Sequence, residues 1–180
     1  MSDHPSAAEN GWLTIASDEL SAAINPHGAE LSSIRDGEGR ELMTDADPRW
    51  WTGRAPLLFP VVGKPAGETI RVDGQVYPMK QHGFARRRDF QVVSHEESRV
   101  VFALGDDADT RASYPFAFQL GAAFTIVQAT LELAITIHNP GDTPLPASFG
   151  FHPAFAWPLP YGATREDHRI TFAADEFEPL

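Results

Sequence analysis

Short apolar runs in which every second residue is apolar are the most regular feature of the chain. The clearest is 131–138, LELAITIH, where Leu or Ile occupies every odd-numbered position. A period of two turns one set of side chains to the same face, as in a strand with one buried side. The sequence NPGD at 139–142 ends the run with turn-forming residues. The pattern therefore predicts a β-strand over 131–138.

Similar short apolar runs recur along the chain and favour an all-β fold. We expect further strands at 12–16, 20–24, 29–34, 92–93, 100–104 and 116–127. The segments 92–93 and 100–104 flank a polar stretch and are typical of a hairpin. Fifteen prolines and fourteen glycines leave little room for long helices. Strands at such regular spacing predict an antiparallel β-sandwich or barrel.

Two segments, 44–68 and 149–161, lack this regularity. In the first, Pro56 and Pro60 bound a short apolar run, and proline is poorly compatible with a central strand. Adjacent tryptophans at 50 and 51 precede that run. We expect the first segment to be a packed loop at the rim of a sheet. The second segment is rich in aromatic residues and proline.

Length and composition restrict the classes of function. A chain of 180 residues is typical of one domain, which we place at 11–180 after a polar, disordered tail at 1–10. Fourteen basic against 25 acidic residues give a net charge of −11. A field of that sign repels phosphate backbones and anionic lipid, so we expect neither nucleic-acid nor membrane binding.

Cysteine usage and hydropathy point to the cytoplasm. The sequence has no cysteine, which excludes disulfides and thiolate chemistry. The sequence has no run of 18 apolar residues, so we expect no membrane span. The first residues do not resemble a signal peptide. We therefore expect a cytoplasmic protein.

The first candidate for chemistry is His82, followed by Gly83, in the stretch 77–90. Glycine allows a sharp turn or a close approach of the backbone to a ligand. Arg86, Arg87 and Arg88 follow as a basic cluster, and on a strand the middle one would point away from the other two. The residues alone also fit a solvated cationic turn with a hydrogen-bonded histidine.

The second candidate is His152, in the sequence FGFHPAF at 149–155. Three phenylalanines and a proline predict a histidine that is at least half-buried. Desolvation would lower its pKa and leave it neutral near pH 7, where an imidazole can exchange protons. A core histidine bonded to backbone is the alternative interpretation.

Other motifs carry less information. No HxH or HExxH spacing supports a metal site, and no nucleotide-binding or nucleophile-elbow pattern is present. The aromatic residues Trp50, Trp51, Phe155 and Trp157 fit either stacking on a sugar ring or a place in the core.

Four stretches taken together resemble the aldose 1-epimerase (galactose mutarotase-like) family. They are NPHGAELSSI at 25–34, APLLFPVVG at 55–63 with HGFAR at 82–86, YPF at 114–116, and GFHPAF at 150–155. The last is similar to the family's LacX-like branch. The resemblance runs in order through residues 12–180 and implies a large antiparallel β-supersandwich.

The resemblance also implies an activity, the interconversion of α and β anomers of an aldohexose by acid–base ring opening. By position, His152 matches the general acid, and His82 matches a second histidine that hydrogen-bonds near the reacting oxygen. Arg86, Arg54 and Phe155 are the expected substrate ligands. The implied partner is an aldose or a sugar phosphate, with no metal and no organic cofactor.

The family's general base is a glutamate near the C-terminal end of a longer chain. We therefore expect the sandwich to be incomplete at the C-terminus of this sequence, where Glu176 and Glu178 do not match that base by position. A sandwich that lacks strands exposes unpaired edges, which predicts self-association of the chain.

Two alternatives accompany this hypothesis. Hexose-6-phosphate 1-epimerases carry a similar HGFAR stretch, and Arg86 with Arg54 would then bind the phosphate as guanidinium groups do. A non-catalytic carbohydrate-binding protein or an inactive fragment is the other, because the glutamate base is absent from the matched part.

Overall fold

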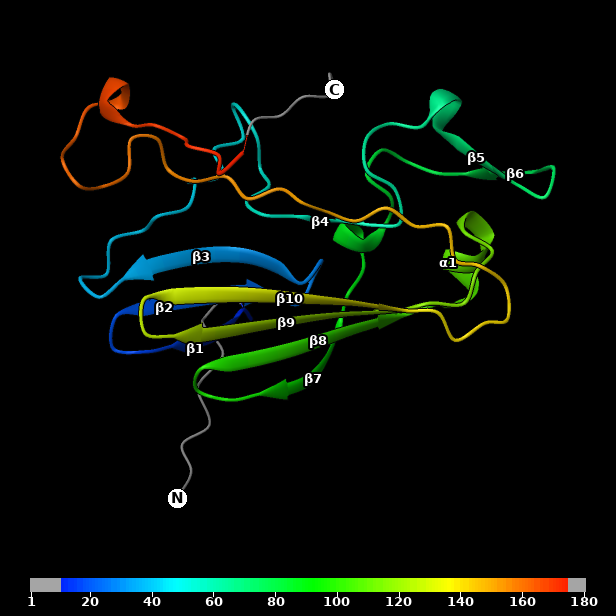
Figure 1. The fold of residues 1–180 in the computed structure, drawn as a ribbon, viewed down its shortest axis with the longest axis horizontal. Coiled ribbons are helices and arrows are strands. Elements are labelled where there is room, and N and C mark those ends of the chain that lie inside the picture. Colours follow the sequence, from blue (N-terminus) through cyan, green and yellow to red (C-terminus); the bar gives the residue numbers. More distant parts are fainter. Residues whose placement is uncertain (1–10, 175–180) are drawn as a thin grey trace.

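Antiparallel strands account for most of the regular structure in the computed structural model, which describes residues 11–174 (Figure 1). The strands are β1 (Leu13–Ala16), β2 (Leu20–Asn25), β3 (Glu30–Asp36), β4 (Leu57–Leu58), β5 (Thr69–Val72), β6 (Gln75–Pro78), β7 (Gln91–His95), β8 (Arg99–Gly105), β9 (Gln119–Val127), β10 (Thr130–His138) and β11 (Gly150–Phe151). One α-helix, α1 (Ala108–Ser113), and three 3₁₀ turns, η1 (Ala66–Glu68), η2 (Ala85–Arg87) and η3 (Arg165–Asp167), complete the described part. The all-β prediction is confirmed.

Two sheets pack against each other and enclose the core. One has the order β1-β2-β3 and the other β10-β9-β8-β7. Alternating side chains from both sheets are buried between them, as the period of two predicts. Among them are Ile15, Ile24, Leu31, Val100, Phe102, Leu120 and Phe124.

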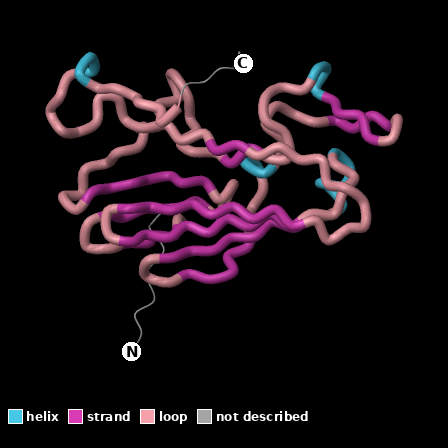
Figure 2. The backbone as a smooth tube through the Cα atoms, viewed as in Figure 1, coloured by secondary structure: helices cyan, strands magenta, loops and turns pink. Residues whose placement is uncertain are grey.

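Two small two-stranded units lie on one side of these sheets. β4 pairs with β11, and β5 pairs with β6. Figure 2 shows that most of the loops lie on the same side, and Figure 1 places β4 between the β5–β6 hairpin and the looped segment that follows β11. The two irregular segments of the sequence, 44–68 and 149–161, meet there.

The strands predicted at 12–16, 20–24, 29–34 and 131–138, and the hairpin around 94–99, are confirmed with small changes in their ends. The strand predicted at 116–127 begins later, at Gln119. The reason lies at Phe118, whose N–H donates to the side chain of Asp106 at 3.1 Å and not to a neighbouring strand.

The β5–β6 hairpin and α1 were not predicted. Asp73 and Gly74 form the hairpin turn with φ of 48° and 80°, the left-handed geometry that an Asp-Gly pair adopts in such turns. Asp107 caps α1 by accepting the N–H of Thr110 at 2.8 Å.

Some expectations fall on residues for which the structure gives no description. The predicted tail at 1–10, and Glu176 and Glu178, lie outside residues 11–174. A single domain over 11–180 stays a prediction. Within the described part, none of the helices has the length and apolar character needed to cross a bilayer.

Candidate active site

A tight turn at His82 and Gly83 forms the first part of the site. Both residues have a positive φ, 62° and 69°. Gly83 lies so close to Phe59 that a Cβ there would be 2.1 Å from the Phe59 carbonyl oxygen. No side chain larger than hydrogen fits, so the sequence needs glycine at this position.

Two hydrogen bonds to Gly63 fix the ring of His82. The N–H of His82 donates to the carbonyl of Gly63 at 2.9 Å, and the N–H of Gly63 donates to His82 Nδ1 at 3.0 Å. Because Nδ1 accepts, the neutral ring carries its proton on Nε2. Nε2 lies 3.2 Å from the side-chain amide of Gln81.

The surroundings of His82 hold its pKa below the usual value of 6.5. Burial has the largest effect, followed by the charges of Arg86, His152 and Arg87. Both effects disfavour the imidazolium form. The neutral form of His82 is therefore favoured at pH 7, and the charge of a protonated His152 is one of the causes.

His152 follows β11, which β4 positions. Gly150 and Phe151 pair with Leu58 and Leu57, and the N–H of His152 donates to the carbonyl of Pro56 at 3.3 Å. The His152 ring stacks on Trp51, with centroids 5.0 Å apart and planes at 27°.

The predicted burial of His152 was wrong, because the residue is exposed. The phenylalanines expected to enclose it do not do so. Phe151 and Phe155 are exposed themselves, at 37% and 52%, although β4, with which β11 pairs, is buried. An exposed imidazole next to an aromatic plane is accessible to a ligand from solvent.

The segment around β4 connects the two histidines. β11 pairs with β4, and just beyond β4 the carbonyl of Phe59 accepts the N–H groups of Phe84 and Ala85 at 3.0 and 3.2 Å. The residues from Ala55 to Pro60 are buried. The proline-bounded run thus holds the His82 turn and the His152 segment in fixed positions.

The three arginines have separate environments. Ala85–Arg87 form the turn η2 and not a strand, so the alternation that a strand would give does not apply. Arg86 Nη2 donates to the carbonyl of Gln81 at 3.3 Å, beside His82. Arg87 Nη1 donates to the carbonyl of Gly83 at 2.7 Å, and Arg88 pairs with Asp107 and Asp109.

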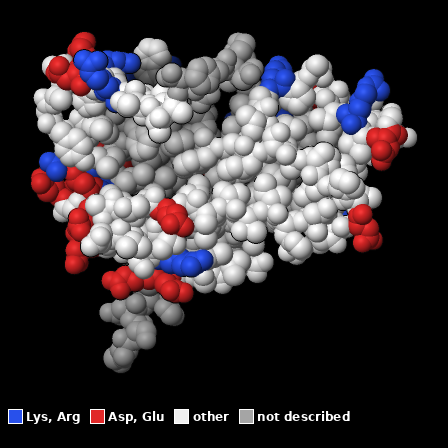
Figure 3. Space-filling view, in the orientation of Figure 1, with Lys and Arg blue, Asp and Glu red and all other residues white. Residues whose placement is uncertain are grey.

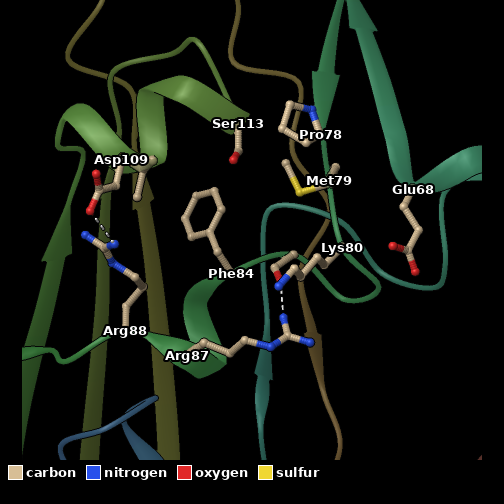
Figure 4. Close-up of a pocket in the computed structure, with 11 residues that line it drawn as sticks. Glu68, Pro78, Met79, Lys80, Phe84, Arg87, Arg88, Asp109 and Ser113 are labelled. Atoms are coloured by element: carbon tan, nitrogen blue, oxygen red, sulfur yellow. Dashed lines mark hydrogen bonds and ion pairs between the residues drawn. The ribbon is translucent and has the colours of Figure 1, made fainter.

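Figure 4 shows Arg87 and Arg88 in a pocket of about 400 Å³ that also contains Phe84, Met79 and Lys80. His82 and His152 do not line this pocket. Arg86, unlike Arg87 and Arg88, does not line this pocket. The pKa of Arg86 is lowered, mainly by burial. Arg86 is therefore the arginine best placed for a ligand at His82.

Arg54 is used to hold backbone together. Its Nη1 donates to the carbonyl of Thr44 at 2.7 Å, and its Nη2 donates to that of Asp45 at 3.2 Å. The guanidinium also lies 5.8 Å from the centroid of the Trp12 ring. A role for Arg54 in substrate binding stays a prediction, and so does that of Phe155, which forms a β-bridge with Met43.

The sequence did not link the two histidines to their immediate partners, although it named Trp51 as a residue for sugar stacking or for the core. Gly63 donates a hydrogen bond to His82, the side-chain amide of Gln81 lies against Nε2 of the same ring, and Trp51 contacts His152. A positive φ of 89° at Gly63 fits its place in a turn, but its contact with His82 spans 19 residues of sequence. In the described part of the chain, no three His, Asp or Glu side chains are grouped as metal ligands.

Comparison with known proteins shows to which family the chain belongs. The family model for aldose 1-epimerase matches residues 12–180. The chain belongs to the aldose 1-epimerase family. The galactose mutarotase-like fold expected from the resemblance is confirmed by solved structures.

Two structures from lactobacilli illustrate the match. A galactose mutarotase related enzyme from Lactobacillus acidophilus is 34% identical with a TM-score of 0.83, covering 87% of this chain and 52% of its own. A galactose mutarotase-like protein from Lactobacillus casei is 35% identical with a TM-score of 0.78, covering 81% of this chain and 50% of its own.

A curated relative supports the LacX-like branch. The protein LacX of Lactococcus lactis is 28% identical over 175 residues, which is 91% of this chain and 57% of LacX. The chain thus spans little more than half the length of the relatives that it matches.

Proposed function

We propose that this family member interconverts the α and β anomers of an aldohexose at the site of His82 and His152. The observation that carries the proposal is that one segment, residues 57–59, holds both histidine segments in place. One histidine is held neutral by its surroundings, and the other is exposed on an aromatic plane, with β4 fixing both loops. Anomer exchange needs proton transfer at the ring oxygen and at the anomeric hydroxyl, and imidazole side chains can donate or polarise at such oxygens.

His152 acts as the general acid in this proposal. It donates a proton to the ring oxygen while a base removes the proton of the anomeric hydroxyl, so the C1–O5 bond breaks and an aldehyde forms. The aldehyde rotates, and the reverse transfers close the ring on its other face. Stacking on Trp51 restricts the tilt of the imidazole and so orients the proton that it donates.

His82 orients and polarises the substrate. Its Nδ1 is occupied by the N–H of Gly63, so Nε2–H is the group that donates to a sugar oxygen, which takes the place of the Gln81 side-chain amide now 3.2 Å away. Because its pKa is lowered, His82 stays a neutral donor and does not compete with His152 for a proton. Arg86, beside it, provides further donors.

The base is the remaining component. The resemblance implies a glutamate nearer the C-terminal end of a longer chain. Within residues 11–174, the ring contacts of His82 and His152 are with Gly63, Gln81 and Trp51 and include no carboxylate. In this proposal the described site therefore supplies the acid and the orienting group of the reaction. We also propose that the reaction takes place in the cytoplasm.

Polarimetry tests this function. Freshly dissolved α-D-glucose and α-D-galactose should mutarotate faster with the purified chain than in buffer. His152→Ala should remove most of the acceleration. Imidazole groups in general catalyse proton transfer, so His138→Ala is the control, because His138 is an exposed histidine on β10. Acceleration lost equally in both variants would contradict a specific site. Sugar binding without any acceleration would favour a non-catalytic carbohydrate-binding protein.

A hexose 6-phosphate is a second candidate substrate. It is favoured by Arg86, whose guanidinium makes one hydrogen bond, of 3.3 Å, among residues 11–174 and keeps donors there for a phosphate. Arg54 has less capacity, because its donors already bind two carbonyls. Arg86→Ala should raise the KM for glucose 6-phosphate at least tenfold more than that for glucose. Equal changes in the two KM values would exclude a phosphate site at Arg86.

A further inference from the structure

The pocket drawn in Figure 4 adjoins the His82 turn but lies outside the candidate active site. Gly83 and Phe84 line it, whereas His82 and His152 do not. We call it the basic pocket; its walls come from the end of β6, from the His82 turn with η2, and from α1. Its volume of about 400 Å³ falls in the range of pockets that hold small ligands.

Two apolar side chains form a fixed surface in the basic pocket. Met79 is 2% exposed. The ring of Phe84 packs in the core, with its centroid 5.7 Å from that of Phe118 and 6.1 Å from that of Phe59. A surface that is already ordered binds an apolar group without a further loss of side-chain entropy. The pocket therefore provides a preformed place for a flat apolar group.

Two cations of the lining, Lys80 and Arg87, form no ion pair with any residue of the described part, 11–174. Lys80 is exposed, and Arg87 uses only Nη1, which donates to the carbonyl of Gly83 at 2.7 Å. Two like charges that line one pocket repel each other, and a bound anion removes that cost. Since the chain as a whole carries a net charge of −11, composition does not account for unpaired positive charge here.

The carboxylates of the lining do not cancel these two charges. Glu68 lies 3.4 Å from Lys64 Nζ, and Asp109 lies 3.6 Å from Arg88 Nη1. Each carboxylate therefore has a cation partner of its own. The pocket combines a flat apolar surface with two cations that keep their capacity for an anion.

We propose that the basic pocket binds a small organic phosphate whose body is flat and apolar. The phosphate lies against Lys80 and Arg87, and the apolar body lies on Phe84 and Met79. A phosphate monoester carries close to two negative charges at pH 7, which matches two unpaired cations. A guanidinium also binds two phosphate oxygens at once.

A ligand in this pocket acts on His82 through Arg87. Arg87 holds the carbonyl of Gly83, the residue that follows His82 in the turn. After burial and the charges of Arg86 and His152, the charge of Arg87 is a further cause that lowers the pKa of His82. A bound phosphate offsets that charge and favours the imidazolium form. The ligand is therefore an effector of the neighbouring site.

Isothermal titration calorimetry with phenyl phosphate, inorganic phosphate and benzyl alcohol tests the pocket. Phenyl phosphate should bind at least tenfold more tightly than the other two, because each of them has only one of the two recognised groups. Arg87→Gln and Lys80→Gln should each weaken its binding about tenfold, as expected for the loss of a charged hydrogen bond. Arg71→Gln is the matched control and should leave the affinity unchanged, because Arg71 is exposed on β5 and lies outside the lining.

Three results would overturn the inference. They are no saturable binding of phenyl phosphate, equal affinity for phenyl phosphate and inorganic phosphate, and binding that is lost in Arg86→Gln but kept in Arg87→Gln. The last result would place the phosphate at the candidate active site. The titrations contain no sugar and involve no turnover, so the inference does not depend on the proposed function and fails separately from it.

NMR titration of His82 tests the effector role. The midpoint of its ring protons should rise when the wild-type chain is saturated with phenyl phosphate, and should not respond to the ligand in Arg87→Gln. A midpoint that stays the same in the saturated wild-type chain would overturn the effector role.

Discussion

His82 differs from an ordinary surface histidine in that burial and nearby cations keep it neutral. Its folded pKa lies below the unfolded value of about 6.5. The contribution of neutral His82 to stability is therefore complete above that pH and decreases as the pH falls toward the folded pKa. Acid conditions weaken the turn that presents this ring.

The titration of His82 gives a test at the scale of a residue. We expect the NMR midpoint of its ring protons to lie below 6.5, and Arg86→Ala to raise it, because the charge of Arg86 is one of the causes of the shift. Arg99→Ala is the control, since Arg99 is exposed on β8 and does not contribute. An unchanged midpoint in Arg86→Ala would show that the guanidinium does not act on His82.

At this scale the sequence singled out two histidines, whose catalytic role stays a prediction, but it did not give their environments. His82 and His152 lie in short motifs that residue type and the family resemblance both single out. The exposure of His152 depends on the pairing of Leu57–Leu58 with Gly150–Phe151. That contact joins segments more than 90 residues apart, and local composition carries no information on it.

Among the elements, the contact between β4 and the His82 turn supports the site most directly. The carbonyl of Phe59 accepts two N–H groups there, and Gly83 lies against the same carbonyl. The close approach leaves no space for a side chain. The position of His82 therefore depends on the absence of a Cβ one residue later.

Alanine in place of Gly83 should destabilise the fold by about 2–4 kcal/mol, because it adds a backbone clash to the cost of a positive φ. Gly74→Ala is the matched control. Gly74 has a φ of 80°, but a Cβ added there would meet no other atom within 4 Å, so about 1 kcal/mol is expected. Urea unfolding measures both. Equal losses of unfolding free energy in the two variants would mean that the contact with Phe59 does not exclude a Cβ at position 83.

The elements also show why some predictions failed. Alternating apolar residues identified the strands of the two main sheets, because those strands bury one face. In β5 and β6 most side chains are exposed, so the pattern is absent, although the Asp73-Gly74 turn is a recognisable signal. Helix α1 has six residues, too few for a helical period to appear in the sequence.

For the whole molecule, β10 is the longest strand with a free edge in the described part, where it pairs with β9 alone. Figure 3 shows that the middle of the face drawn there is largely uncharged, with most charged groups near its margins. Antiparallel pairing of two copies about Ala134 would place Leu133 opposite Ile135 and Glu132 opposite Thr136. No like charges would face each other.

We therefore expect association of the chain that depends on concentration and proceeds through β10. Thr136→Lys places a charge on the exposed edge and should shift the elution volume toward that of a monomer. Gln128→Lys adds the same charge in the β9–β10 turn and should not do so. A wild-type chain that elutes as a monomer at all concentrations in size-exclusion chromatography would contradict this prediction.

The central claim is that His82 and His152 act as one catalytic unit, and a double-mutant cycle in the mutarotation assay tests it most directly. Rates above the buffer blank are compared for the wild type, His82→Ala, His152→Ala and the double variant. We predict that each single change removes most of the acceleration and that the second removes little more, as for groups that act on one bond. Losses that multiply, full activity in either single variant, or a wild-type rate equal to the blank would contradict the claim.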